Sequence, residues 1–179
     1  MEKIFRVCVF TISVLLVVGI IKTVTIQKFD RLRETMLVSS NDVVSIRERE
    51  QQLECLAKNI YYEAGNEPFE GKVAVAQVTM NRVDSGKFGN GVCGVVYQKN
   101  IFYEKVVCQF SWYCDRTVKL KPIHKDVYEE SMEVAKKVLL EGFRLDVIKT
   151  AMYYHADYVN PGWKKQKIGK IGRHIFYKG

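Results

Sequence analysis

Apolar residues recur at helical spacing through residues 53–64 and predict a helix with one face turned toward a core. This stripe is formed by Leu53, Leu56, Ala57, Ile60 and Ala64. Gly65 follows directly and predicts the end of the helix, because glycine suits the backbone conformation of a helix C-terminus. Glu63 lies at the edge of the stripe, so its carboxyl group is expected to be neither central in the core nor fully solvated.

Two further helices are predicted downstream. Pro68 suits the first turn of the second helix, whose apolar stripe consists of Phe69, Val73, Ala76, Met80 and Val83. A third helix is expected over about residues 125–140. Between these helices, residues 84–94 are glycine-rich and predict a loop, and residues 92–98 form a short apolar element. Residues 102–115 are rich in aromatic and β-branched side chains and predict an irregular strand or hairpin.

The N-terminus carries an apolar run over residues 7–21, preceded by Lys3 and Arg6 and followed by Lys22. Its length suits a signal-peptide core, and extension to Ile26 gives the ~20 residues of a membrane span. A signal-anchor is favoured over a cleaved signal peptide, because no Ala-x-Ala cleavage site is present. We therefore predict residues 1–26 as a signal-anchor or signal peptide, 27–50 as a polar stalk or linker, and 51–179 as the folded domain, located outside the cytoplasm in the cell envelope.

Charge narrows the class of partner. The chain has 179 residues, 47% of them hydrophobic, and a formal net charge of +8. This charge favours an acidic partner: nucleic acid, an anionic membrane or an anionic wall polymer. No nucleic-acid-binding motif is present, and membrane targeting argues against a nucleic-acid partner. The tail, residues 163–179, is basic and contains no acidic residue, which suits attraction to an anionic wall or membrane polymer.

Four of the five cysteines lie in the folded domain: Cys55, Cys93, Cys108 and Cys114. An even number after a secretion-like segment predicts disulfides formed in an oxidising compartment. Four cysteines allow three pairings, which all stay open, although a Cys108–Cys114 bond is favoured because it would close the aromatic segment. Zinc binding is the alternative, but no Cys-x-x-Cys and no histidine at ligand spacing accompany these residues.

Glu63 is the leading candidate for acid–base chemistry. A carboxyl group in the last turn of a helix meets the negative end of the helix dipole, and partial burial also disfavours its charged form. Both effects raise its pKa, and a glutamic acid that keeps its proton can protonate a leaving group. The simpler alternative is a solvated glutamate at a helix end.

The stretch around Glu63 resembles the SleB-like cell-wall hydrolases, the family of spore-cortex lytic enzymes and their relatives. Its motif is matched by Ile60, Tyr61, Glu63, Ala64, Glu67, Pro68, Gly71, Ala74, Val75, Ala76, Val78, Asn81, Arg82 and Val83. Gly65-Asn66 replaces the usual Arg-Gly. Later blocks match at residues 92–98, 109–112 and 153–155, and in a closing Gly172-x-His174-x-Phe176-Tyr177. The resemblance covers about residues 53–178.

The resemblance implies a predominantly α, α+β fold of the lysozyme-like kind, with a few short strands beside a cleft. It also implies a peptidoglycan glycosidase that acts on glycan strands, with Glu63 as catalytic acid and with neither metal nor cofactor. Ordinary glycosidases use two carboxylates. The nearest second acids are Asp115 and Glu104, and neither lies in an obvious motif, so a lytic transglycosylase with a single acid is preferred over a hydrolase.

The residues expected to contact the glycan come from the matched blocks and from aromatic character. They are Tyr62, Asn81, Gln109, Phe110, Ser111, Trp112, Tyr153, Tyr154 and His155. For Phe110 and Trp112 the alternative is a place in the core.

Two other functions stay open. One is a non-catalytic envelope-binding or scaffold module. The other is a metal-dependent wall amidase or peptidase, in which His155 and Asp157, two positions apart on a strand, would ligate a metal together with a distant partner.

Overall fold

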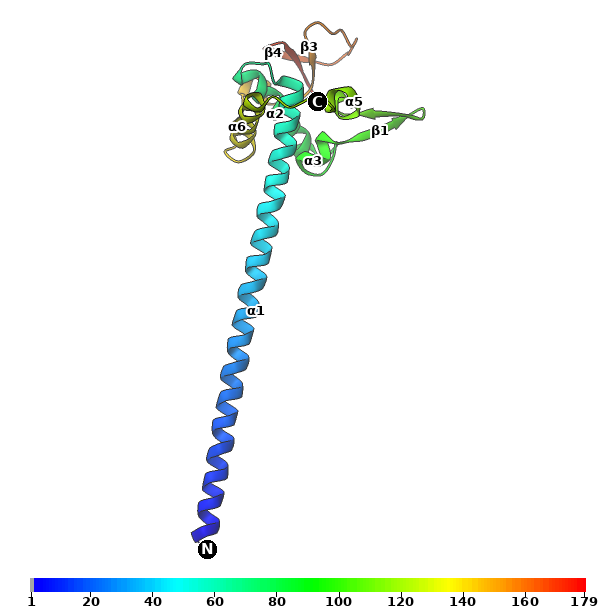
Figure 1. Cartoon of the computed structure of the whole chain (residues 1–179). Helices are drawn as coiled ribbons and strands as arrows, with labels where there is room; N and C mark the ends of the chain where they lie inside the picture. Colours follow the sequence, from blue (N-terminus) through cyan, green and yellow to red (C-terminus); the bar gives the residue numbers. More distant parts are fainter. Residues whose placement is uncertain (1) are drawn as a thin grey trace. The chain divides into compact units, whose positions relative to one another are not determined.

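The structure, a computed structural model, describes the backbone of residues 2–179, and the side chains of residues 3–15, 17, 34–44 and 102 lie outside the described set. The chain divides into two compact units, Met1–Arg47 and Glu48–Gly179. Helix α1 (Glu2–Ala64) contributes residues to both units (Figure 1).

The first unit is helical over its described residues. Its described apolar side chains are exposed, for example Leu16 at 63% and Phe29 at 68%. Among the described residues, no helix combines the length and the apolar character needed to cross a membrane. Most side chains of the predicted membrane segment, residues 1–26, lie outside the described set, so this segment stays a prediction.

Helix α2 (Phe69–Ser85) is the central element of the second unit. All of its residues from Gly71 to Met80 are buried, as expected for a helix that is covered on every side. The predicted stripe is therefore narrower than the buried surface of α2. It is wrong for Phe69, which is 41% exposed and whose ring centroid lies 6.0 Å from that of Phe143. Glycine ends the helix: Gly86 adopts the left-handed conformation, with φ 65°.

Two core clusters lie on different sides of α2. In the first, Val73, Ala76 and Met80 pack with the end of α1, with α3 (Gly91–Val96) and with α6 (Lys125–Leu139). In the second, Ala74 and Val78 pack against the C-terminal strands. The helix predicted over residues 125–140 is confirmed, and it runs beside α2 (Figure 1).

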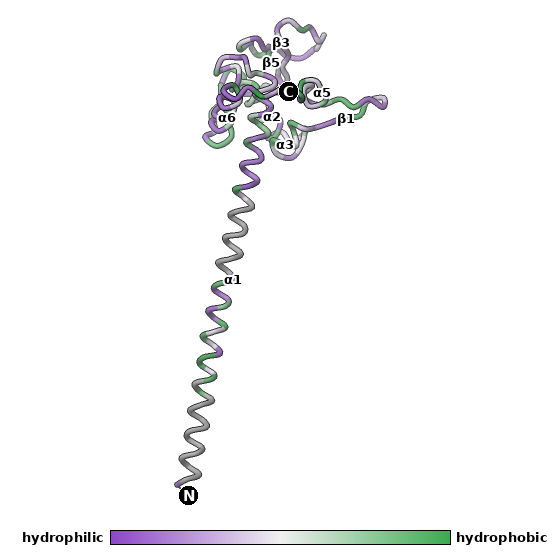
Figure 2. The backbone as a smooth tube through the Cα atoms, in the orientation of Figure 1, coloured by the Kyte–Doolittle hydropathy of each residue, from purple (hydrophilic) through white to green (hydrophobic). Residues whose placement is uncertain are grey.

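A two-stranded hairpin projects from the domain. Strands β1 (Lys99–Phe102) and β2 (Lys105–Cys108) pair antiparallel, and Figure 2 shows apolar stretches in the hairpin between a hydrophilic start of β1 and a hydrophilic turn. The predicted hairpin is confirmed here, but the chain then forms two short helices, α4 (Ser111–Cys114) and α5 (Arg116–Lys119). The Cys108–Cys114 disulfide joins the hairpin to α4, as favoured, and a Cys55–Cys93 disulfide joins α1 to α3.

The chain ends in a three-stranded antiparallel sheet in the order β3-β5-β4, which follows a short 3-10 helix, η1 (Asp146–Ile148). The strands are β3 (Ala151–Ala156), β4 (Lys167–Ile171) and β5 (His174–Lys178). Tyr154 pairs with Phe176 on the face that meets α2, so its neighbours Tyr153 and His155 lie on the other face. The prediction of a mostly helical domain with a few short strands is confirmed.

Candidate active site

Glu63 is the penultimate residue of α1. The turn that follows it brings the backbone of Gly65 close to the Tyr61 carbonyl. The Gly65 amide donates to the carbonyl of Tyr61 at 3.1 Å. A Cβ atom at position 65 would lie 2.5 Å from that same oxygen, so only glycine allows this turn. The predicted helix stop is confirmed, and it leaves the Glu63 side chain at the end of a rigid element.

Tyr154 is the direct partner of the acid. Its hydroxyl donates to Oε2 of Glu63 at 2.9 Å, across 91 positions of sequence. The strand that carries Tyr154 is tied to α2 by two side chains. Asn81 Nδ2 donates to the Ala151 carbonyl at 2.7 Å, and Arg82 Nε donates to the Met152 carbonyl at 2.8 Å.

The environment of Glu63 favours the neutral acid. Burial raises the pKa of its carboxyl group, and this effect outweighs two opposing ones, the hydrogen bond from Tyr154 and the positive charge of Arg82. Burial, followed by the nearby Glu63, raises the pKa of the Tyr154 hydroxyl well above its usual value, so this hydroxyl remains a donor. The expectation of a raised pKa at Glu63 is confirmed, with burial as its main cause.

Arg82 is a buried cation close to this pair. Only 4% of it is exposed, and its guanidinium lies 5.1 Å from the ring centroids of Phe88 and Phe110 and 6.0 Å from that of Tyr153. Burial lowers its pKa, while Tyr154, Tyr153 and Glu63 act in the opposite direction. Its Nη1 atom has no hydrogen-bond partner among the described residues.

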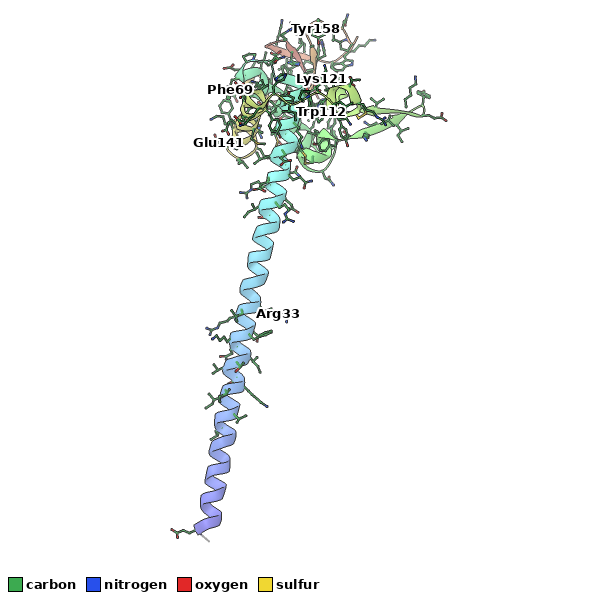
Figure 3. All side chains as sticks on the ribbon, viewed as in Figure 1. Arg33, Phe69, Trp112, Lys121, Glu141 and Tyr158 are labelled. Atoms are coloured by element: carbon green, nitrogen blue, oxygen red, sulfur yellow. A yellow bond between two sulfur atoms is a disulfide. The ribbon has the colours of Figure 1, made fainter. Side chains whose placement is uncertain are left out.

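Glu63 lines an open cavity of about 480 Å³. Besides α1 and the turn after it, the walls come from the connection between α5 and α6 and from the ends of β3 and β5. The polar and aromatic side chains at this cavity are Tyr61, Tyr62, Glu63, Asn66, Glu67, Lys121, His124, Tyr158, Arg173 and His174. Lys121, Tyr158 and Arg173 are exposed, and Figure 3 shows Tyr158 at the end of the domain that carries the strands.

Glu67 is a second carboxylate in this cavity. Its Oε2 accepts the backbone N–H of Arg173 at 2.9 Å. Gly172, at φ 55°, lies so close to this oxygen that a Cβ there would collide with it. Glu67 thus joins the α1–α2 turn to the β4–β5 turn and places His174 beside Tyr154, with ring centroids 5.2 Å apart.

The two acids considered from the sequence serve elsewhere. Oδ1 of Asp115 caps α5 by accepting from the backbone N–H groups of Thr117 and Val118 and from the Thr117 hydroxyl. The hydrogen bonds from Thr117 are the main cause of its lowered pKa. Glu104 lies in the hairpin turn, at φ 64°. Neither belongs to the cavity around Glu63.

Two of the predicted glycan-contacting residues lie at the acid. Tyr62 lines the cavity, and Tyr154 holds the carboxyl group. Ser111 is exposed at the start of α4, and Gln109 is half-buried, its backbone N–H donating to the Gln98 carbonyl at 2.9 Å. Asn81 anchors β3, as described above.

Phe110 and Trp112 are core residues, which corrects the expectation that they face a glycan. They are 3% and 6% exposed, and Figure 3 shows Trp112 among the helices of the domain. Trp112 stacks on Tyr62 at 4.4 Å, and its Nε1 donates to Oδ1 of the buried Asn59 at 3.0 Å. Asn59 therefore satisfies the indole N–H inside the core, a partner that spacing along the chain does not indicate.

Tyr153 and His155 lie on the face of β3 opposite Tyr154. Both ring nitrogens of His155 are engaged, Nδ1 with the Ala156 carbonyl and Nε2 with the Tyr177 hydroxyl, each at 2.8 Å. Asp157 forms an ion pair with Lys170 at 2.8 Å. The two proposed metal ligands already have other partners, so they do not support the amidase or peptidase alternative.

Lys121, His124, Tyr158 and Arg173 were not selected from the sequence. They lie in connections and at strand ends, where no periodicity marks which side chain meets the cavity. The sequence did indicate that Glu67 could lie near Glu63, since it follows Glu63 by only four positions across a helix break.

A half-buried carboxylic acid of raised pKa, held by a tyrosine at the wall of an open cavity, is the arrangement found in enzymes that use general acid catalysis. Comparison with known proteins specifies the family. Residues 66–177 match the family described as cell wall hydrolase. The spore cortex-lytic enzyme of Bacillus cereus is 32% identical over 137 residues, which cover 72% of this chain and 45% of that enzyme.

Two solved structures are also similar. The catalytic domain of the Bacillus cereus SleB protein has a TM-score of 0.52 and 28% identity, over 72% of this chain and 91% of that domain. The catalytic domain of the germination-specific lytic transglycosylase SleB from Bacillus anthracis has a TM-score of 0.52 and 29% identity, over 71% and 93%. The chain belongs to the cell wall hydrolase family. It spans less than half the length of the curated cortex-lytic enzyme that it matches.

Proposed function

We propose that this domain, with a lysozyme-like helical core, is a lytic transglycosylase that cleaves the bond from N-acetylmuramic acid to N-acetylglucosamine in peptidoglycan. The observation that carries the proposal is the setting of Glu63: an acid whose pKa is raised by burial, at the wall of an open cavity of about 480 Å³. The names of the cortex-lytic relative and of the SleB transglycosylase support peptidoglycan as the substrate and transglycosylation as the reaction.

In the first step, the carboxylic acid of Glu63 gives its proton to the glycosidic oxygen as the bond from that oxygen to C1 of the muramic sugar breaks. Tyr154 donates to Oε2, which leaves the other carboxyl oxygen to carry the proton. General acid catalysis of this kind contributes about 10²–10⁴ in rate.

In the second step, the Glu63 carboxylate accepts the proton of the muramic C6 hydroxyl while that oxygen bonds to C1. This closes a 1,6-anhydro ring, returns Glu63 to its acid form and consumes no water. The Tyr154 hydroxyl and the Arg82 charge both stabilise the carboxylate that exists between the two steps. One group can therefore act first as acid and then as base.

Hydrolysis is the second candidate, because Glu67 shares the cavity and could activate a water molecule. The backbone N–H of Arg173 already engages one oxygen of Glu67, which favours a structural role and therefore transglycosylation.

Mass spectrometry of fragments released from peptidoglycan by the purified full chain tests both candidates. Transglycosylation yields anhydro ends, whereas hydrolysis yields reducing ends that are heavier by one water. Glu63→Gln should lose about 10²–10⁴ in rate with the fold intact, while Glu67→Gln should retain the anhydro product. Full activity of a folded Glu63→Gln chain would overturn the proposal, and reducing ends that vanish in Glu67→Gln would establish hydrolysis.

We further propose that residues 1–26 hold the domain at the outer side of a membrane. Fractionation of cells that produce the full chain tests this, because release of the protein into the soluble fraction would contradict an anchor.

A further inference from the structure

The outer face of the C-terminal sheet carries a cluster of rings that the proposed reaction does not use. Trp163, in the loop between β3 and β4, contacts three rings edge to face: Tyr153 at 6.1 Å, His155 at 5.6 Å and Tyr177 at 5.7 Å between centroids. His155 stacks on Tyr177 at 5.3 Å. These four residues are called the aromatic platform below.

The platform is separate from the cavity of Glu63. Successive side chains of a strand point to opposite faces, so Tyr154 reaches Glu63 while Tyr153 and His155 lie on the other face, where the Tyr153 ring is 6.0 Å from the Arg82 guanidinium. None of the four platform residues lines the cavity.

The platform is accessible to solvent at Trp163. Its rings are half-buried, and Trp163 is 40% exposed, whereas the other tryptophan, Trp112, is 6% exposed in the core. Trp163 contacts three neighbouring rings, and two of these, His155 and Tyr177, are joined by a hydrogen bond between His155 Nε2 and the Tyr177 hydroxyl. A partly exposed indole that packs against other rings offers a flat apolar surface to a ligand.

The charge around the platform is positive. Nζ of Lys165 lies 3.7 Å from the centroid of the Tyr153 ring, and Lys164 and Lys167 are exposed nearby in the sequence. Residues 158–179 contain no acidic residue. A ligand that fits must combine flat apolar faces with negative charges at intervals.

We propose that the aromatic platform is a second glycan-binding surface, on which pyranose rings of a peptidoglycan strand stack against Trp163 while Lys164 and Lys165 pair with carboxylates of the attached peptides. This inference rests on the proposed function for the identity of the polymer. Pyranose rings present apolar C–H faces, and peptide carboxylates supply the charges. Binding at two places on one strand raises the local concentration of the bond to be cleaved.

Retention on insoluble peptidoglycan tests the platform, with the non-cleaving Glu63→Gln full chain as reference. Adding Trp163→Ala should weaken retention about three- to tenfold, in a chain whose melting temperature shows that it is folded. Ile101→Ala is the matched control, because Ile101 is 76% exposed on the distant hairpin. Equal retention of the Trp163 and Ile101 variants would overturn the proposal.

The salt dependence of retention distinguishes the contribution of ring stacking from that of the lysine charges. Lys164→Gln with Lys165→Gln should weaken retention at 0.1 M salt and have little effect near 1 M, because the Debye length falls from ~10 Å to ~3 Å. This pair of substitutions also tests the surface if Trp163→Ala does not fold. The effect of Trp163→Ala should persist at both salt concentrations. Loss of binding to DNA but not to peptidoglycan in these variants would assign the platform to nucleic acid and overturn the glycan proposal.

Kinetic measurements distinguish a failure of the proposed binding surface from a failure of the proposed reaction. In the active chain, Trp163→Ala should raise KM for long strands, leave kcat unchanged and leave cleavage of short fragments unaltered. If no variant of the chain cleaves glycan while Trp163→Ala still weakens retention, the reaction is wrong and the binding surface stands. If cleavage is normal and long-strand KM is unchanged, the surface is wrong and the reaction stands.

Discussion

Three influences set the acidity of Glu63, and they come from three parts of the fold. Burial at the end of α1 raises its pKa, while the Tyr154 hydroxyl from β3 and the Arg82 charge from α2 lower it. Because burial has the largest effect, the pKa of Glu63 lies above its usual value. Because the other two oppose it, the carboxylate is still stabilised when the proton has been transferred.

Replacing Tyr154 with Phe removes the hydrogen bond that favours the carboxylate, so the pKa of Glu63 should rise further. Activity that needs the protonated acid is lost as pH rises through that pKa. The alkaline limb of kcat should therefore move to higher pH in Tyr154→Phe, as measured from a pH–rate profile.

Arg82→Lys, which keeps a positive charge, serves as the control and should move the limb less than Arg82→Met. Glu67, Lys121, His124, Arg173 and His174 also line the cavity and are unchanged in all of these variants. An alkaline limb that stays in place or moves to lower pH in Tyr154→Phe would contradict the role given to the hydroxyl.

Glu63 should also lower stability at high pH. Its pKa in the folded chain is raised above 4.5, so its favourable contribution is complete below pH 4.5 and is lost as pH rises through the folded pKa. Glu63→Gln cannot ionise, so its melting temperature should exceed that of the unaltered chain at pH 8, and the gap should narrow toward pH 4. A gap that is independent of pH would count against a raised pKa.

At the scale of elements, helix α2 organises the domain because it is buried on all sides and ties its neighbours by polar side chains. Gln77 exchanges two hydrogen bonds with the backbone of Leu145, at 3.1 and 2.7 Å. Thr79 accepts from the buried Asn59 of α1 at 3.2 Å. These buried polar contacts fix the positions of α1 and of the chain before β3 relative to α2.

Asn59 and Trp112 together give a prediction at this scale. Trp112→Phe removes the N–H that satisfies Oδ1 of Asn59, and an unsatisfied buried acceptor costs about 1–3 kcal/mol. The free energy of unfolding, measured with denaturant, should fall by at least that amount, and the smaller ring adds the cost of a cavity. Trp163→Phe, at the exposed tryptophan, should change it by much less. Equal losses in the two variants would show that Trp112 is not held as described.

At the scale of the whole molecule, two disulfides brace the second unit. The Cys55–Cys93 bond spans 38 positions and the Cys108–Cys114 bond spans 6. Because a cross-link restricts the unfolded chain more when its loop is longer, the first bond should stabilise the domain more. Thiol titration of denatured, unreduced protein from an oxidising compartment should find all four cysteines blocked.

Replacing both cysteines of a pair with Ala measures how much each disulfide contributes to the free energy of unfolding. Loss of Cys55–Cys93 should lower the free energy of unfolding by roughly 1–2 kcal/mol more than loss of Cys108–Cys114, from loop length alone. Denaturant unfolding of the two double variants, each compared with the unaltered chain, gives these values. A larger loss of stability on removal of Cys108–Cys114 would show that contacts of the hairpin, rather than the length of the closed loop, determine the stabilisation.

Several features could be read from the sequence because they depend on neighbours in the chain. The helix before Gly65 and the helix over residues 125–139 follow from local spacing and turn chemistry, and the strand or hairpin predicted over residues 102–115 coincides in part with the hairpin over residues 99–108. The place of Glu63 at the edge of an apolar stripe is of the same kind. The motif blocks also indicated the family, which the comparisons confirm.

Which faces meet was decided only by the tertiary structure. Spacing along β3 required Tyr153 and Tyr154 to face opposite ways but did not say which one reaches Glu63, 91 positions away. Composition marked Trp112 as a candidate for an open cleft, whereas Asn59, 53 positions distant, holds it in the core. The physical reason is range: periodicity records what each residue does within its own element, while burial, hydrogen-bond partners and the pKa of Glu63 arise from elements packed together in space.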